Sequence, residues 1–186
     1  FLILTAARSG EVRGATWDEI DLAARVWTIP GERMKASKAH RVPLSDAVIA
    51  LLEEMKALAL AAGRTTGKAY VFPSPNSRDP ELGSALSDMT LTAVLRRLKL
   101  EAVPHGFRST FRDWCAEQTD YPNEVAEMAL AHAVGNKVEA AYRRGDLLAK
   151  RQQLMQDWAD YALGRRAGNM TVGHSAGGAV STRDVN

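Results

Sequence analysis

The chain has 186 residues, of which 46% are hydrophobic and 25% are charged, a balance typical of a single globular domain. The net charge is only +2, which is too small to indicate nucleic-acid binding by itself. Cys115 is the only cysteine, so an intrachain disulfide is excluded, and no apolar run has the length that a membrane span requires. A cytoplasmic protein without a membrane partner is therefore expected.

The first part of the chain predicts two short helices and a β-hairpin. Residues 1–7 have an apolar helical pattern that breaks near Arg8, and Ser9 suits the N-cap of a following helix. Residues 25–30 and 41–44 are strand-like runs on either side of a polar, basic connection, which is the pattern of a hairpin.

The remainder predicts mostly helix. Ser45 is the expected N-cap of a long helix in which apolar residues recur every three or four positions, and residues 70–72 are a candidate third strand. Residues 164–186 are rich in Gly, Ala, Ser and Thr without apolar periodicity, which predicts a disordered tail. The other helices are expected at residues 87–98, 106–118, 123–130, 137–144 and 147–163. The predicted fold class is mainly α with a small antiparallel β-sheet.

Six side chains of chemically useful types stand out: Arg8, Lys35, His105, Arg108, His132 and Tyr142. Taken singly, each has a more ordinary explanation, such as a helix cap, a solvated charge or a half-buried ring. Their order and their sequence context are more informative than any one of them.

The segments around these residues resemble the catalytic boxes of the tyrosine recombinases, and most closely those of prophage and genomic-island integrases. The matching segments are residues 5–12 (TAARSGEV), the acidic turn 17–21 (WDEID), the hairpin 34–44 (MKASKAHRVPL), residues 105–108 (HGFR), residues 130–132 (LAH), and Tyr142 ten positions after His132. The resemblance covers about residues 1–163. It implies that these residues form an integrase catalytic domain, truncated at its N-terminus and preceded in the family by a separate DNA-binding domain.

The resemblance also implies DNA strand cleavage and rejoining through a 3′-phosphotyrosyl intermediate, with no metal, ATP or other cofactor. Two guanidinium groups suit this chemistry, because each is permanently charged and presents a planar fork of donors to a phosphate. The roles that it assigns are Tyr142 as nucleophile, Arg8 and Arg108 as the phosphate clamp, His105 as the base for Tyr142, His132 as a hydrogen-bond partner of the phosphate, and Lys35 as the acid that protonates the leaving 5′-oxygen.

The expected partner is double-stranded DNA at attachment sites, together with further copies of the protein in a tetramer and DNA-bending accessory proteins. Cations beside the boxes are candidates for contacts with backbone phosphates: Arg13, Arg33, Lys38, Arg41, Arg112, Arg143 and Arg144. His40 is expected on the hairpin surface and His174 in the tail. Phe107, Phe111 and Trp114 recur at helical spacing and are expected to face the core.

Three alternatives remain open at this level. A type IB topoisomerase would share the six residues but relax supercoils instead of exchanging strands. A DNA-binding relative without catalysis, or a protein-interaction module, would not need all six side chains.

The place of the last helix, at 147–163, also remains open, because it can dock on its own chain or on a neighbouring subunit.

Overall fold

The computed structural model describes residues 1–132 and 145–165. The elements are α1 (Leu2–Thr5), α2 (Ser9–Arg13), the 3₁₀ helix η1 (Trp17–Glu19), β1 (Ile20–Asp21), β2 (Val26–Ile29), the 3₁₀ helix η2 (Gly31–Arg33), β3 (His40–Pro43), α3 (Asp46–Ala61), α4 (Thr90–Arg97), α5 (Gly106–Gln118), α6 (Asn123–Ala129) and α8 (Leu148–Ala162). The predicted fold class, mainly α with a small antiparallel sheet, is confirmed. The helix predicted at 137–144 and most of the predicted tail lie outside the described residues.

The sheet has three antiparallel strands in the order β1-β2-β3. Trp27 is paired with Ile20 on one side and with Val42 on the other, and its side chain is completely buried. The prediction of a strand at residues 70–72 was wrong, because Tyr70 makes only an isolated bridge, with Thr16. The short turn after η1 folds back onto β2 instead and supplies the third strand.

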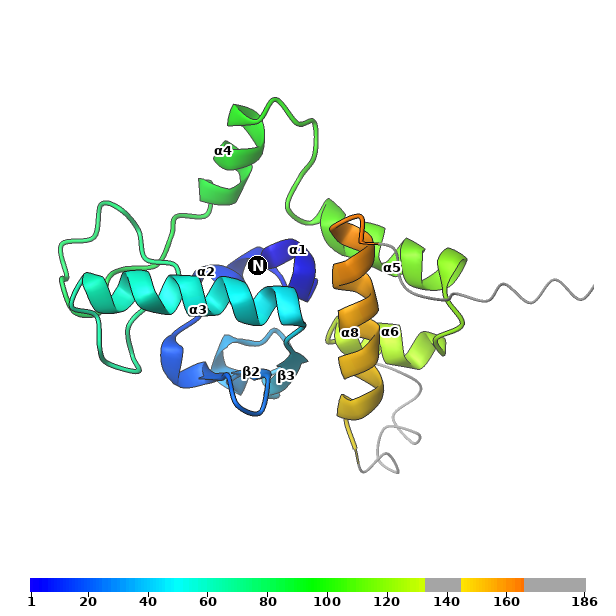
Figure 1. Ribbon diagram of the computed structural model, residues 1–186. Helices are drawn as coiled ribbons and strands as arrows, with labels where there is room; N and C mark the ends of the chain where they lie inside the picture. Colours follow the sequence, from blue (N-terminus) through cyan, green and yellow to red (C-terminus); the bar gives the residue numbers. More distant parts are fainter. Residues whose placement is uncertain (133–144, 166–186) are drawn as a thin grey trace, which may run out of the picture.

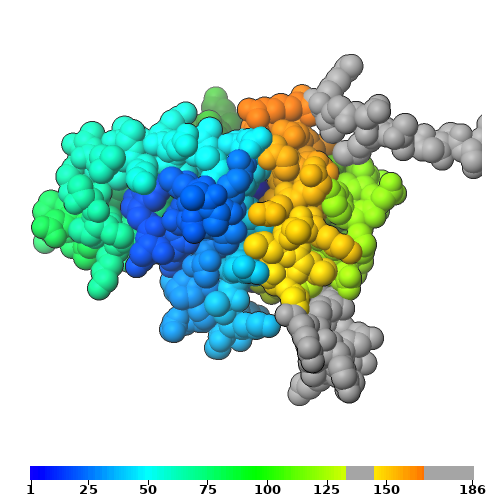
Figure 2. All heavy atoms as spheres, turned by 60° about the horizontal axis from the view of Figure 1, so that its bottom comes forward, coloured from blue at the N-terminus to red at the C-terminus, as the bar shows by residue number. Residues whose placement is uncertain are grey.

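The molecule has two separate hydrophobic cores, and we call the parts built around them the sheet half and the helical half. The core of the sheet half is built from α2, the sheet and α3, and includes Trp27 and Leu52. The core of the helical half is built from α5, α6 and α8, and includes Phe111 and Trp158. Figure 2 shows α8, coloured yellow to orange, between the sheet half on one side and helices α5 and α6 on the other.

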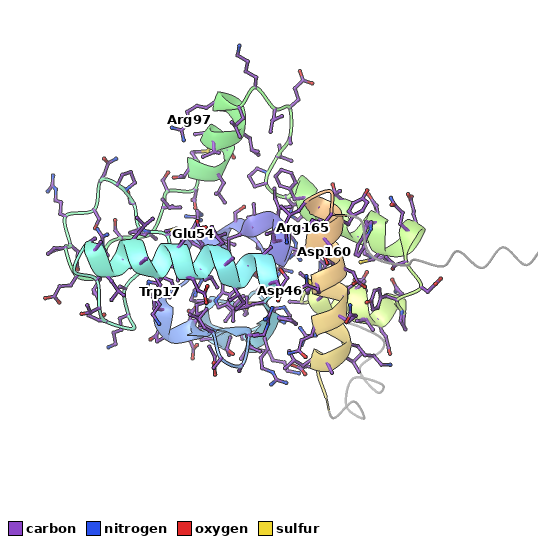
Figure 3. The ribbon with its side chains drawn as sticks, viewed as in Figure 1. Trp17, Asp46, Glu54, Arg97, Asp160 and Arg165 are labelled. Carbon is purple, nitrogen blue, oxygen red and sulfur yellow. The ribbon has the colours of Figure 1, made fainter. Side chains whose placement is uncertain are left out.

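Helix α8 packs on its own chain, where it contacts α1, α6 and β3. The indole nitrogen of Trp158 donates to the carbonyl of Ile3 at 2.8 Å, and Gln156 accepts a hydrogen bond at 2.9 Å from the backbone N–H of Asp46. Figure 3 labels Asp46 at the end of α3 that lies against α8. Ser45 does occupy the N-cap position of α3, but its buried hydroxyl has no partner among the described residues, so the side-chain cap is missing.

Helix α4 stands away from both halves, joined to them by extended connections (Figure 1). Leu98, Leu100 and Val103, in the connection from α4 to α5, are exposed. In the described part of the chain, no helix is long and apolar enough to cross a membrane.

Candidate active site

Arg8 lies where the chain passes from one core to the other. Ala6 ends α1 in the left-handed conformation (φ 48°) and belongs to the helical core, whereas Ala7 belongs to the sheet core. Arg8 follows in an extended conformation as the N-cap of α2, a position that the sequence had suggested for Ser9. The turn therefore places a cation at the junction of the two halves.

Glu11 holds Arg8 in this position. One carboxylate oxygen accepts from the Arg8 guanidinium at 2.7 Å, and the other accepts from the backbone N–H of Arg8 at 2.8 Å. The second bond caps the start of α2, where N–H groups lack helical partners. Glu11 is 5% exposed, and a buried carboxylate is stable only when it is paired in this way. Glu11 was not among the residues singled out in the sequence, although it lies in the segment 5–12 that resembles a catalytic box, so this role was missed.

Arg108 is the most constrained of the candidates. Its side chain is buried, with one guanidinium nitrogen donating to the carbonyl of Ala6 and another to that of Leu130, the latter at 2.7 Å. Ala6 and Leu130 are the C-caps of α1 and α6, and carbonyls at helix ends have no intrahelical partner. The guanidinium thus satisfies the negative ends of two helices at once.

The electrostatics of Arg108 favour an additional anion. Burial, and next the positive charge of Arg8, lower the pKa of its guanidinium to about 10, although the negative charge of Glu11 opposes the change. Arg108 therefore remains charged at neutral pH, beside a second cation, and its described hydrogen-bond partners are neutral carbonyls and a histidine ring. An anion that binds between the two arginines relieves their repulsion.

His132 lies next to Arg108. Ala131 adopts a left-handed conformation (φ 51°) that turns the chain at the end of α6, and the backbone N–H of His132 then bonds to the carbonyl of Glu127 at 2.9 Å. This turn brings the imidazole Nε2 to 3.3 Å from the guanidinium of Arg108. Together with Arg8, whose charge acts on Arg108, these two side chains form one cluster.

His105 and Lys35 lie at the surface. His105 is exposed at the N-cap of α5, one turn before Arg108. Lys35 is exposed in the connection between β2 and β3, and so is Lys38. Tyr142 lies outside the described residues, so its predicted role as nucleophile is not tested by the structure.

Most of the cations predicted to contact DNA already have partners within the chain. Arg13 bonds to the carbonyl of Leu86, and Arg33 bonds to Glu19 and to the carbonyl of Glu11. The remaining partners are Asp146 for Arg41, and Glu127 and Asn123 for Arg112, whereas Arg143 and Arg144 lie outside the described residues. Their contacts with DNA remain a prediction.

Asp146 connects β3 to the start of α8. Arg41 reaches it through two hydrogen bonds of 2.8 Å, and Arg151 approaches it at 2.9 Å. Arg151 is 1% exposed and also donates to the carbonyls of Asp146 and Arg41. Burial tends to raise the pKa of Asp146, but the hydrogen bonds from Arg41 and the charge of Arg151 outweigh it and lower the pKa.

His40 was expected on the hairpin surface but is half-buried, with its ring against the end of α6. Its Nε2 donates to the carbonyl of Ala129, at 3.3 Å, so it joins β3 to the end of α6. Burial, and next the positive charge of Arg151, lower the pKa of His40 to about 4, although the hydrogen bond to Ala129 opposes the change. The alternation of apolar and polar residues along β3 shows which face of the strand meets the sheet core. It cannot show that the end of α6 covers the other face.

No group of three or more His, Cys, Asp or Glu residues in the described ranges is arranged to hold a metal ion. The geometry is that of an anion site made from two arginines and a histidine, with a carboxylate behind each of Arg8 and His132. Such a site suits a phosphate, which accepts hydrogen bonds from several directions.

Comparison with known proteins identifies the family. The model of the phage integrase family matches residues 1–147. The prophage integrase IntA of Escherichia coli K12 is 38% identical over 174 residues, which cover 92% of this chain and 40% of that protein. The integrase of Enterobacteria phage P4 is 32% identical over 176 residues, which cover 86% of this chain and 38% of that protein.

The chain thus spans about two fifths of the length of these relatives. Among solved structures, the XerA recombinase has a similar fold, with a TM-score of 0.57 at 17% identity over 90% of this chain and 55% of that one. The fold predicted from the sequence, that of a tyrosine recombinase catalytic domain, is therefore confirmed, and the chain belongs to the phage integrase family.

Proposed function

We propose that this chain carries the catalytic centre of a site-specific DNA recombinase that integrates or excises a mobile element. The substrate is double-stranded DNA at an attachment site, bound by four copies of the protein with the help of DNA-bending proteins. Membership of the phage integrase family supports the reaction type. The Arg8–Arg108 pair supports the chemistry.

The arrangement of Arg108 is the observation that supports the proposal most. A buried guanidinium beside a second cation is unfavourable unless an anion joins it. Glu11 is already paired with Arg8, and the two neutral carbonyls orient the Arg108 guanidinium without neutralising it. A scissile phosphate supplies the missing charge. Because the donors are fixed before the substrate arrives, they stabilise the additional negative charge of the transition state without rearrangement.

The reaction begins when the phenolic oxygen of Tyr142 attacks the phosphorus atom. His105 accepts the phenolic proton, because a free tyrosine with a pKa near 10 is a weak nucleophile at neutral pH. Lys35 donates a proton to the 5′-oxygen as its bond to phosphorus breaks. The products are a 3′-phosphotyrosyl bond and a free 5′-hydroxyl, and attack by the 5′-hydroxyl of another strand reverses these steps without ATP.

Replacement of Tyr142 by Phe tests the nucleophile. The wild-type chain is incubated with a pool of nicked duplexes of random sequence, in which loss of the short fragment beside the nick traps any covalent adduct. Adducts are captured under denaturing conditions, and the modified peptide is located by mass spectrometry. Tyr142→Phe should fold like the wild type, because only one hydroxyl group is lost, and should form no adduct.

Tyr121 and Tyr161 provide matched controls. The hydroxyl of Tyr121 donates to Asp157 at 2.6 Å, and burial and this bond raise its pKa, so Tyr121 is a poor nucleophile. Tyr121→Phe and Tyr161→Phe should therefore retain the adduct. An adduct on either tyrosine, or one that persists in Tyr142→Phe, refutes the assignment, and the lack of any adduct with the wild type counts against the proposed function.

A further inference from the structure

Glu127 lies between two side chains that both donate to it. One carboxylate oxygen accepts from the Nδ1 of His132 at 2.8 Å, and the other accepts from the Nε of Arg112. Arg112 also donates to the side-chain oxygen of Asn123 at 2.6 Å. A continuous hydrogen-bonded chain therefore runs from the start of α6, through Arg112 and Glu127, to the imidazole of His132.

These contacts determine which ring nitrogen of His132 carries the proton. Burial acts to raise the pKa of Glu127, but the hydrogen bonds from Arg112 and His132 outweigh it, so its pKa is lowered and the carboxylate is ionised at neutral pH. An ionised carboxylate can only accept, so Nδ1 must be the protonated nitrogen. A guanidinium can only donate, so the Nε2 beside Arg108 is the acceptor in the neutral ring.

We propose that Glu127 is a positioning residue for the recombination chemistry: it fixes the ring and the tautomer of His132, so that Nε2 faces the phosphate held by Arg108. This inference rests on the proposed function, in which His132 acts on that phosphate. When Nε2 is protonated it donates to a non-bridging oxygen, and the carboxylate compensates the charge of the imidazolium. Glu127 touches no reacting atom and acts only through His132.

The spacing of the arginines explains how Glu127 is itself held. Arg108 and Arg112 are four residues apart on α5, so they lie on one face of that helix. Arg108 binds the end of α6 through Leu130, and Arg112 binds it one turn earlier through Glu127. The two arginines therefore fix α5 and α6 relative to one another. Arg112 is engaged in holding Glu127 and does not lie free on the surface.

Nuclear magnetic resonance of the chain labelled with ¹⁵N-histidine tests the tautomer without DNA. The signals of His132 are identified by their loss in His132→Gln, at a pH high enough to keep the ring neutral. In the wild type, Nδ1 should have the chemical shift of a protonated nitrogen and Nε2 that of an unprotonated one. Glu127→Ala should shift the ring toward the Nε2-protonated form that free imidazoles prefer in water, because the remaining contact of Nε2 with Arg108, at 3.3 Å, is longer than the 2.8 Å bond that is lost and does not hold the ring by itself. Glu127→Gln should retain the wild-type pattern, because its amide oxygen still accepts from Nδ1.

Adduct formation with the nicked duplex pool gives the second measurement. Glu127→Ala should slow it by about 10–100-fold, which corresponds to the loss of one charge-assisted hydrogen bond. Glu127→Gln should recover part of the rate, because it restores the orientation of the ring but not the charge. Glu117→Ala is the control, since Glu117 is exposed on the same helix as Arg112 and should change neither measurement.

The resonance measurement and the adduct assay test different parts of the inference. A wild-type ring protonated at Nε2, or a pattern that Glu127→Ala leaves unchanged, overturns the inference whatever the DNA assay shows. The expected tautomers together with an unchanged rate in Glu127→Ala overturn the positioning role in the reaction. If the wild type forms no adduct at all, the proposed function fails, while the tautomer pattern still supports or refutes the fixed ring by itself.

Discussion

The two halves of the molecule hold their candidate catalytic residues in contrasting ways. In the helical half, Arg108 is 5% exposed and bonds to two carbonyls, and His132 is fixed between Arg108 and Glu127. In the sheet half, Lys35 is exposed in the connection between β2 and β3. One half presents a preformed group of donors, and the other presents a side chain at the surface.

The proposed chemistry gives a reason for this difference. Donors that stabilise a charged transition state are most effective when they are already oriented, because no energy is then spent on arranging them during the reaction. An acid that protonates a leaving oxygen must instead reach an atom whose position is set by the bound DNA. We therefore expect substitutions of Arg108 to affect stability and cleavage together, and substitutions of Lys35 to affect cleavage alone.

Arg108→Ala should have the largest effect. It leaves the carbonyls of Ala6 and Leu130 without their partner, which should lower the free energy of unfolding by about 2–5 kcal/mol. It also removes a transition-state donor, which should slow adduct formation by about 10²–10³-fold. Urea unfolding and the nicked-duplex assay measure the two effects. Arg97→Ala is the control, because Arg97 is exposed on α4 (Figure 3), and an Arg108 variant as stable as this control would contradict the structural role.

Lys35→Ala should slow cleavage by about 10²–10⁴-fold, the usual contribution of one acid–base group, while changing stability by less than about 0.5 kcal/mol. A cleaved sequence recovered from the pool can be remade with sulfur as the bridging 5′ atom, which leaves without a proton. That substrate should restore most of the cleavage to Lys35→Ala but not to Arg108→Ala. Lys38→Ala should change cleavage little, and rescue of Lys38→Ala in place of Lys35→Ala would mean that the acid is the other lysine.

His40 should give the smallest effect, one that depends on pH. The folded chain binds a proton at His40 only below about pH 4, whereas the unfolded chain binds one below the ordinary pKa of 6.5. Between these values the unfolded state holds more protons, so His40 makes the free energy of unfolding fall as the pH falls, by up to about 1.4 kcal/mol per pH unit. His40→Gln retains a donor for the Ala129 carbonyl but cannot titrate. Urea unfolding between pH 7 and pH 4 should show a shallower decline of the free energy of unfolding in the variant, and equal slopes would refute a neutral His40 in the folded chain.

The helices were largely predictable from the sequence. Residues 106–118 were predicted as a helix and α5 has the same bounds, because Phe111 and Trp114 recur on one face and are both buried. The third strand was assigned to the wrong segment. Residues 70–72 have the apolar pattern of a strand, whereas the strand that completes the sheet is the two-residue β1. Val71 is indeed buried, but its N–H bonds to the carbonyl of Ala15 outside any ladder.

The order of the motifs in the sequence was enough to identify the candidate residues. It did not identify the side chains that hold those residues and elements in place. Arg112 and Arg41 had the same appearance as any cation beside a catalytic box, and their carboxylate partners are 15 and 105 residues away. Glu127 and His40 gave no signal because their roles depend on how α6 approaches α5 and β3. Local patterns predict which elements form, whereas polar contacts between elements depend on packing that no single segment encodes.

The contacts of Arg108 also have a consequence for synthesis of the chain. They join it to residues 102 and 22 positions away, one on each side along the sequence. Contacts across such separations form only after the intervening chain has closed into a loop, which makes them late events in folding. A chain still emerging from the ribosome has Arg108 before it has Leu130, so its phosphate clamp is incomplete. The ability to hold a phosphate at this site is therefore acquired only when the α6 region has been made and has docked.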